Sequence, residues 1–258
     1  MNFKYKLIKF SSNKFEDIDD SISIEEPLEI SLKYKKNDKW MNQNLSVTMR
    51  TPGDDKDLVR GFLFNEQIIQ NINDIKSIES YGDKVGKYNI QNKILATLSN
   101  AENVDISKIK RDFLTNSSCG VCGKSSLDAL QIVKKSKINP FEPKITKEII
   151  VKSPDVLRQK QSEFSKTGGI HASGLFNSNG DLIALKEDVG RHNALDKLIG
   201  CVLSNEQLDP KNQFITCSGR LNFELVQKVL MTDIGIMIGV GAPTSLAIDL
   251  ANKFDITL

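Results

Sequence analysis

The pattern of apolar residues changes partway along this 258-residue chain, and that change limits the folds it can adopt. The first hundred residues contain several short runs that are β-rich or alternate between apolar and polar residues, which predicts an antiparallel sheet. These runs span 3–10, 27–34, 44–50 and 93–99. Between them, apolar residues such as Leu58, Phe62 and Ile69 recur at helical spacing, which predicts one helix capped near Asp54 or Asp55.

From residue 170 onward, short apolar runs alternate with helical segments, which is typical of a layered α/β domain. The turn "NSNGD" at 177–181 predicts a hairpin between the first two strands, so the sheet is expected to be mixed rather than wholly parallel. Upstream, Ser153 and Pro154 are expected to open a helix that runs toward Phe164.

Three regions follow from these patterns. Residues 1–115 are expected to form a β-rich part with one helix, and residues 146–258 an α/β domain. Residues 116–145 lie between them and hold two cysteines and a predicted connecting helix at 125–135.

Charge and hydropathy give no support for several classes of protein. The chain has 35 Lys and Arg against 33 Asp and Glu, so no strong field attracts nucleic acid or an anionic membrane. The N-terminus has no apolar run of signal-peptide length, and the most apolar stretch, 234–243, is far shorter than the roughly 20 residues that span a bilayer. We therefore expect a soluble, cytoplasmic protein that binds neither nucleic acid nor membrane.

The two central cysteines, Cys119 and Cys122, have a spacing that suits a metal site, disulfide exchange or sulfur transfer. Zinc needs two further ligands, and neither His171 nor His192 has a second ligand nearby in the sequence, so no metal is expected. Disulfide exchange of the thioredoxin type needs a cysteine at a helix start directly after a strand, whereas Ser and Gly flank this pair. Sulfur transfer through a persulfide remains, and the cation of Lys124 nearby favours the thiolate.

Three other stretches combine glycines with polar or charged residues. "KTGGIHASG" places His171 after Gly168 and Gly169, "KEDVGRHNALDK" follows at 186–197, and "CSGRLNFELVQK" at 217–228 is a predicted strand end followed by a helix. The carboxyl ends of strands and the N-termini of helices bind anions in α/β sheets, so these stretches suit a phosphate.

Each stretch also has a purely structural interpretation. The Ser218–Arg220 segment is an ordinary turn on that interpretation, and Asp188, Arg191 and Asp196 are a solvated charge cluster at a helix start. Cys201 and Cys217 lie in apolar runs and are expected to be buried, inert thiols.

Taken together, eight blocks resemble the FdhD family of sulfur carriers required for formate dehydrogenase activity, in that family's order. The blocks are "EEPLEI", "RTPGDD", "GFLFNEQII", "SSCGVCGK", "TGGIHASGL", "KEDVGRHNALDK", "CSGRLNFELVQK" and "GAPTSLAIDLA". The resemblance implies a cytidine-deaminase-like layered α/β/α domain with a mixed sheet and a smaller β-rich N-terminal part, in a protein that is usually a homodimer.

The resemblance also implies a sulfurtransferase activity. The protein would receive sulfur from a cysteine desulfurase as a persulfide on Cys119, with Cys122 as its neighbour. It would pass that sulfur to the molybdenum bis-guanine-dinucleotide cofactor before the cofactor enters the formate dehydrogenase apo-enzyme. The alternative is a non-catalytic chaperone of the cofactor or apo-enzyme whose cysteines are structural.

The resemblance implies that the α/β domain of residues 146–258 binds this nucleotide cofactor, for which GDP is a partial mimic. Phosphate chemistry and the resemblance together predict the residues that bind it. These residues are Gly168, Gly169, His171, Arg191, His192, Ser218, Gly219 and Arg220. Lys186 stands where family members commonly have Arg, and a lysine cannot bind a phosphate bidentately.

Overall fold

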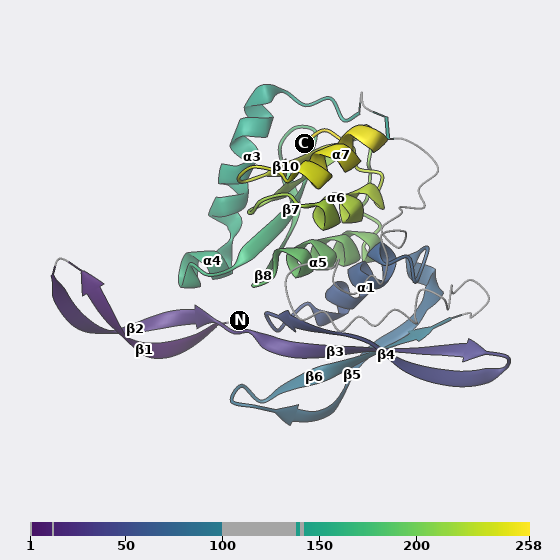
Figure 1. The fold of residues 1–258 in the computed structure, drawn as a ribbon, viewed down its shortest axis with the longest axis horizontal. Helices are drawn as coiled ribbons and strands as arrows, with labels where there is room; N and C mark the ends of the chain where they lie inside the picture. The colour runs from purple at the N-terminus through teal and green to yellow at the C-terminus, as the bar shows by residue number, and fades with distance from the viewer. Residues whose placement is uncertain (1, 12, 100–137, 140–141) are drawn as a thin grey trace.

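Within the described residues, the strands form a two-stranded hairpin and two four-stranded sheets (Figure 1). The computed structural model describes residues 2–11, 13–99, 138–139 and 142–258. Cys119, Cys122, Lys124 and the predicted helix at 125–135 lie outside the described residues, so the predictions about them stay predictions.

The N-terminal sheet is mixed, and the prediction of an antiparallel sheet is wrong at its centre. Its strands are β3 (Glu26–Lys36), β4 (Lys39–Arg50), β5 (Ile75–Val85) and β6 (Ile90–Leu98), in the order β4-β3-β6-β5. The pairs β3–β4 and β5–β6 are antiparallel hairpins, but β3 and β6 pair in parallel. Helix α1 connects the two hairpins, and such a crossover permits parallel pairing where a tight turn does not.

Helix α1 (Asp55–Asn65) begins after Asp54, as predicted, and a short 3-10 helix, η1 (Ile72–Asp74), precedes β5. Asp55 and Asp57 lie in the first turn of α1, where their negative charges interact favourably with the helix dipole and stabilise the helix. The helix ends at Asn65, so Ile69 packs against the sheet from the segment beyond it. The core between α1 and the sheet is apolar and buried, and includes Leu28, Ile30, Leu32, Leu58, Val59, Leu63, Ile94 and Leu98.

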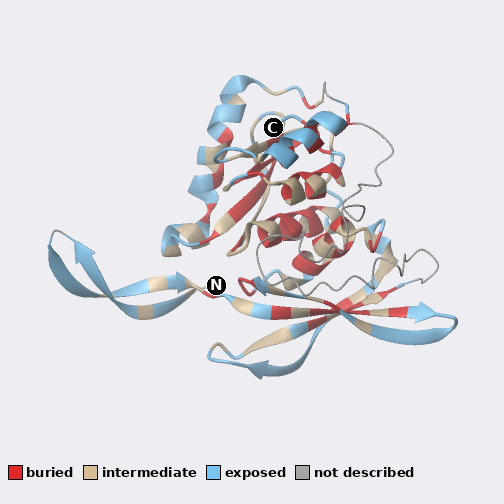
Figure 2. Ribbon diagram, viewed as in Figure 1, coloured by how far each residue is buried: buried red, intermediate tan, exposed pale blue. Residues whose placement is uncertain are grey.

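The hairpin of β1 (Asn2–Ser11) and β2 (Lys14–Ser23) extends away from the rest of the protein and is mostly exposed (Figures 1 and 2). The run at 3–10 is a strand as predicted, whereas β2 has no β-rich pattern because acidic residues with low strand propensity interrupt it. Pairing with the lysines of β1 compensates for this, as in the opposite residues Lys6 and Asp19.

The C-terminal sheet has the order β10-β9-β7-β8 and consists of β7 (His171–Asn177), β8 (Leu182–Asp188), β9 (Gln213–Cys217) and β10 (Met237–Gly239). β7 is antiparallel to both neighbours, β8 and β9, while β9 and β10 are parallel. The predicted hairpin and the predicted mixed sheet are both confirmed.

Helices cover both faces of this sheet (Figure 1). On one face, Leu157 of α3 (Lys147–Lys160) packs with Phe176 and Phe214. On the other face, Leu175 and Ile215 pack with α5 (Arg191–Ser204), α6 (Phe223–Leu230) and α7 (Ser245–Phe254). Adjacent residues of one strand thus enter different cores. Figure 2 shows buried residues in the strands of the sheet and in the helices beside it. The likeness to cytidine deaminase stays a prediction.

Helix α3 begins at Lys147, six residues before the predicted start, and encloses Pro154. Proline has no N–H to donate to the carbonyl of Ile150. The hydroxyl of Ser153 donates to that carbonyl instead, at 3.2 Å, which explains how the helix continues through the proline. The helix then ends at Lys160, and a separate short helix, α4 (Ser162–Thr167), leads to Gly168.

The N-terminal sheet joins the C-terminal domain through α1 and α5, which pack against each other (Figure 1). Gly61 of α1 and Gly200 of α5 lie where these helices cross, and neither position has room for a Cβ atom. None of the helices in the described part of the chain is long and apolar enough to cross a membrane. The division into three regions stays a prediction.

Candidate anion-binding site

Three helices begin at one edge of the C-terminal sheet. Strands β8, β9 and β10 run in the same direction, because β7 is antiparallel to both β8 and β9 and β9 is parallel to β10. Each of the three is followed by a helix, α5, α6 or α7 respectively. β7 runs the opposite way and begins at this edge with His171, which pairs with Asp188 at the end of β8. The edge therefore combines three helix N-termini with an imidazole.

The electrostatics of two of these helix N-termini favour an anion. Helices α5 and α7 follow Gly190 and Thr244, have no side-chain cap, and have no acidic residue in the first turn. Helix α6 differs, because the Asn222 side chain accepts a hydrogen bond from the Leu225 N–H at 3.1 Å and Glu224 lies in the first turn. The uncapped N–H groups of α5 and α7 carry partial positive charge.

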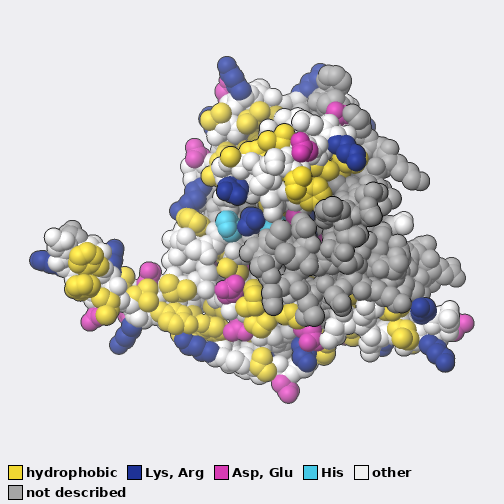
Figure 3. Space-filling model, viewed as in Figure 1, with side chains coloured by type: hydrophobic (Ala, Val, Ile, Leu, Met, Phe, Trp, Pro, Cys, Tyr) yellow, Lys and Arg dark blue, Asp and Glu magenta, His cyan; other side chains and the backbone are white. Residues whose placement is uncertain are grey.

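Four of the residues predicted from sequence come together at this edge. The Ser218 hydroxyl accepts a hydrogen bond from the Ala172 N–H at 2.8 Å and lies 3.3 Å from Nδ1 of His171. A Cβ atom on Gly219 would stand 3.3 Å from that same Nδ1 and 3.9 Å from Cδ of Arg191. Figure 3 shows histidine atoms at the surface beside Lys and Arg side chains.

His171 is half-buried, and its pKa is lowered by burial and by the positive charge of Arg191. The imidazole is therefore neutral at neutral pH. The Nδ1 atom of a neutral ring can accept a hydrogen bond from the Ser218 hydroxyl. The Nε2–H group of the same ring is then a hydrogen-bond donor. His171 thus suits a ligand oxygen without the desolvation cost of a full charge.

Arg191, the first residue of α5, has a buried Nε atom that makes no hydrogen bond within the described residues. A buried guanidinium N–H without an acceptor is costly, and a ligand oxygen would relieve that cost. Arg220 is exposed, and its Cγ lies against the position of Gly241, where the backbone φ of 101° favours glycine.

Gly168 and Gly169 form the turn between α4 and β7. Gly168 ends α4 in the left-handed conformation, with φ of 67°, which glycine adopts without strain. A Cβ atom on Gly168 would meet no atom within 4 Å, so the space beside the turn is open. Their role in binding stays a prediction.

His192 lies deeper than the other predicted residues. Its Nε2 is 3.0 Å from the amide nitrogen of Asn222 and 3.3 Å from a carboxylate oxygen of Glu224. Burial lowers the pKa of His192 to about 4, despite the neighbouring carboxylate. The structure thus places the imidazole against Asn222, the residue that caps α6.

The interpretation of Asp188 and Asp196 as solvated charges is wrong, because both are buried. Asp188 forms an ion pair with Lys197 at 2.7 Å, and Asp196 pairs with Lys228 at 2.9 Å. Burial raises the pKa of Asp188 and raises that of Asp196 to about 6, while the paired ammonium groups oppose the shift. A signal was available in the sequence, since Lys197 and Lys228 each interrupt an apolar helical run.

Sequence reasoning gave no role to Thr51, whose N–H donates to a carboxylate oxygen of Asp188 at 3.1 Å. For Lys186, which stands where family members commonly have Arg, the sequence predicts only a cation that cannot bind a phosphate bidentately. The structure instead pairs Lys186 with Asp54 at 2.7 Å and with Asp57 at 2.9 Å, so its charge is already neutralised.

The thiol of Cys217 is buried, and burial raises its pKa to about 11, which fits an inert cysteine. Cys201 is half-buried rather than buried, contrary to the prediction, because its thiol faces the exposed side chain of Asn205, whose nitrogen lies 3.5 Å from the sulfur. Over the described ranges, no three His, Cys, Asp or Glu side chains are grouped so that they would hold a metal ion.

The family model described as FdhD/NarQ matches residues 23–258. A protein of Saccharolobus solfataricus named "Sulfur carrier protein FdhD" is 36% identical over 255 residues, covering 99% of this chain and 90% of its own length. The protein of the same name from Streptomyces coelicolor is 39% identical over 255 residues, with 98% and 88% covered. That from Sulfurisphaera tokodaii is 40% identical over 241 residues, with 93% and 85% covered.

Among solved structures, a formate dehydrogenase accessory protein from Desulfotalea psychrophila has a similar fold. The TM-score is 0.69 at 24% identity, and the match covers 99% of this chain and 90% of that one. The family model spans the N-terminal sheet, the crossing of α1 and α5, and the edge that holds His171, Arg191 and Ser218. This chain belongs to the FdhD/NarQ family.

Proposed function

We propose that this chain is a sulfur carrier for formate dehydrogenase. It takes sulfur from a cysteine desulfurase as a persulfide on Cys119 and passes it to the molybdenum bis-guanine-dinucleotide cofactor, its substrate. Membership of the FdhD/NarQ family supports the proposal, as do the names of relatives that match nearly the whole chain. The proposal includes a homodimer in the cytoplasm that contacts the desulfurase and the formate dehydrogenase apo-enzyme.

One observation carries the nucleotide part of the proposal: the uncapped N-terminus of α5, which begins with Arg191, lies beside His171 at the sheet edge where α7 also begins without a side-chain cap. A diphosphate is a dianion or more, and such groups bind helix N-termini together with Arg donors. In this arrangement Arg191 and Arg220 neutralise the diphosphate, and His171 donates from Nε2. The Gly168–Gly169 and Ser218–Gly219 turns let the backbone approach the ligand, and His192 supports α6 through Asn222.

The transfer of sulfur to Cys119 and its release from Cys119 are both thiol–disulfide exchanges, which need no metal bound by the protein. The Cys119 thiolate attacks the outer sulfur of the desulfurase persulfide; a new S–S bond forms on Cys119, and the desulfurase cysteine leaves as a thiolate. In delivery, the Cys122 thiolate attacks the inner sulfur, which leaves a Cys119–Cys122 disulfide and releases the outer sulfur as hydrosulfide at the cofactor. A cellular thiol then reduces the disulfide.

Calorimetry with GDP and ADP tests the nucleotide part. GDP should bind more tightly than ADP, and Arg191→Gln should weaken GDP binding about tenfold, the loss expected for one charge-assisted contact. Lys211→Gln is the control, because it removes a positive charge from an exposed position before β9, at the other end of that strand. If the unmodified protein binds both nucleotides weakly and equally, this part of the proposal is wrong.

Intact-mass spectrometry after incubation with a desulfurase and cysteine tests the sulfur part. The chain should gain about 32 Da per sulfur atom, and a Cys119→Ala/Cys122→Ala variant should gain nothing at this site. If that double variant still activates formate dehydrogenase, the chain acts as a chaperone and its cysteines carry no sulfur.

A further inference from the structure

Two sequence blocks far apart in the chain, "RTPGDD" at 50–55 and "KEDVG" at 186–190, bind each other through Thr51. The Thr51 N–H donates to Oδ2 of Asp188 at 3.1 Å, and its hydroxyl accepts the Val189 N–H at 3.1 Å. Its carbonyl accepts Nζ of Lys197 at 2.8 Å. Thr51 is buried, and its N–H, hydroxyl and carbonyl contact the end of β8, the turn after it and α5 respectively.

These contacts continue into the first turn of α5. Oδ1 of Asp188 accepts the N–H of Gly190 at 2.9 Å and Nδ2 of Asn193 at 3.3 Å. The same Asn193 nitrogen donates to the Met49 carbonyl at 2.7 Å, so strand β4 also holds the helix start. Arg191 lies between Gly190 and Asn193, and both of its flanks are thus fixed by groups that Thr51 and its neighbours position.

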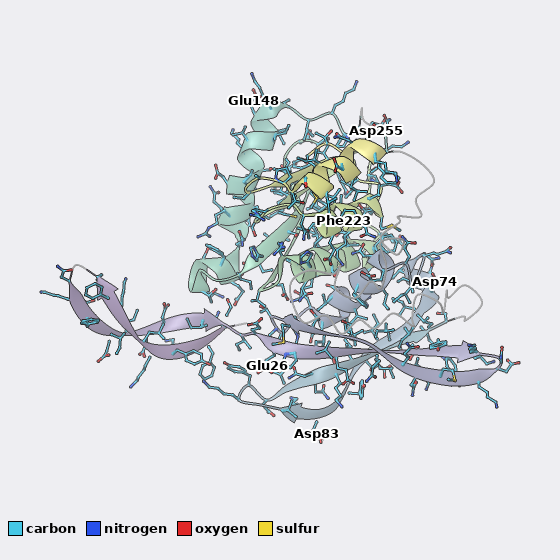
Figure 4. All side chains as sticks on the ribbon, viewed as in Figure 1. Glu26, Asp74, Asp83, Glu148, Phe223 and Asp255 are labelled. Carbon is cyan, nitrogen blue, oxygen red and sulfur yellow. The ribbon has the colours of Figure 1, made fainter. Side chains whose placement is uncertain are left out.

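The other side of Thr51 is anchored in the N-terminal sheet. Arg50 is fully buried, and its guanidinium donates to both carboxylate oxygens of Asp55, at 2.9 and 3.0 Å. It also donates to the carbonyl of Glu26, the first residue of β3 (Figure 4), at 3.2 Å. Near the C-terminal end of the block, Asp54 forms an ion pair with Lys186 of β8. The block is therefore a rigid bridge from β3 to the end of β8.

We propose that Thr51 is a positioning residue of the anion-binding site: it fixes Asp188, and through Asp188 the start of α5 and the side chain of Arg191. The N-terminal sheet then acts as a support for the nucleotide site in addition to any role of its own. The inference rests on the proposed function only for the identity of the ligand.

Three variants separate positioning from a loss of stability. Thr51→Val keeps the shape but removes the acceptor for the Val189 N–H, and Thr51→Ser restores the hydroxyl. Thr232→Val is the matched control. Thr232 is equally buried, lies just beyond the C-terminal end of α6, and donates its hydroxyl to the Val229 carbonyl within that helix. We expect calorimetry to show GDP bound about tenfold more weakly by Thr51→Val than by Thr232→Val, with Thr51→Ser close to the unmodified protein.

The two histidines give a readout that needs no ligand. His171 and His192 are the only histidines of the chain. His171 lies near Arg191 in space and His192 follows it in the sequence, so ¹⁵N-histidine NMR reports on this site alone. Thr51→Val should move both titration curves, and Thr232→Val should move neither. If the unmodified protein does not bind GDP, the nucleotide assignment fails while the histidine titrations still decide the role of Thr51.

A second variant keeps the test decisive if Thr51→Val does not fold. Lys186→Met breaks the Asp54 end of the same bridge from a partly exposed position, and it should shift the histidine signals in the same direction by a smaller amount. Histidine signals and GDP affinity that match those of Thr232→Val, in whichever of the two variants folds, would overturn the inference.

Discussion

Gly200 of α5 lies so close to α1 that a Cβ atom on it would stand 2.8 Å from the backbone nitrogen of Gly61. Backbone atoms cannot move aside as a flexible side chain can, so Gly200→Ala must push the two helices apart. We expect a loss of about 3 kcal/mol or more in the free energy of unfolding, at the upper end of overpacking costs. Denaturant unfolding measures it. In the control, Gly169→Ala, the nearest contact of the new Cβ is 3.8 Å away, and a change as large as that in Gly200→Ala would contradict the explanation.

The buried ion pair of Asp188 and Lys197 gives a second prediction. Lys197→Met leaves the Asp188 carboxylate buried without its cation, which costs about 3–5 kcal/mol. Asp188→Asn in the same chain should recover part of that loss, because no uncompensated charge is then buried. Chemical denaturation of the single and double variants compares them; a double variant less stable than Lys197→Met would contradict this account.

The same single variant has an expected pH dependence. Burial already raises the pKa of Asp188, and removing Lys197 raises it further. The folded state then binds a proton more tightly than the unfolded chain does, so this contribution to stability is present in acid and is lost as the pH rises. The difference in unfolding free energy between Lys197→Met and the unmodified protein should therefore shrink as the pH falls from 7 to 5.

His192 predicts the opposite dependence. Its pKa is lowered from 6.5 to about 4, so the folded state resists protonation that the unfolded chain accepts. Stability from this group is complete above pH 6.5 and is lost as the pH falls toward 4, by about 3 kcal/mol for a shift of this size. His192→Gln cannot titrate, and it should lose less stability than the unmodified protein between pH 6.5 and 4. Parallel stability curves for the two proteins over this interval would refute the assignment.

The alternation of strands and helices after residue 170 predicts the layered C-terminal domain, and the Gly-containing motifs include residues that meet at its candidate anion-binding site. His171, Arg191 and Ser218 are separated in sequence, but each lies at a strand end or helix start that the topology brings to one edge. Such positions are predictable, because local patterns fix where strands end.

Residues whose partners are distant were not predictable in the same way. Asp196 is neutralised by Lys228, which lies 32 residues later on another helix, and Thr51 meets Asp188 after a separation of 137 residues. The parallel pairing of β3 with β6 also depends on how two separate hairpins meet. The lysines that interrupt apolar helical runs indicate buried charge, but no local pattern identifies the distant partner of each charge.

The last prediction separates the two cysteines of the proposed carrier. Cys119→Ala should lose the added sulfur of about 32 Da after desulfurase treatment, because the persulfide forms on that thiolate. Cys122→Ala should still acquire the sulfur and should keep it longer, since no neighbouring thiolate attacks the inner sulfur to release it. The same variant should transfer sulfur poorly and activate formate dehydrogenase weakly. Mass mapping of the cysteine peptide checks both variants, and added sulfur found on Cys122 alone, or undiminished in Cys119→Ala, would reverse the roles of the two thiols.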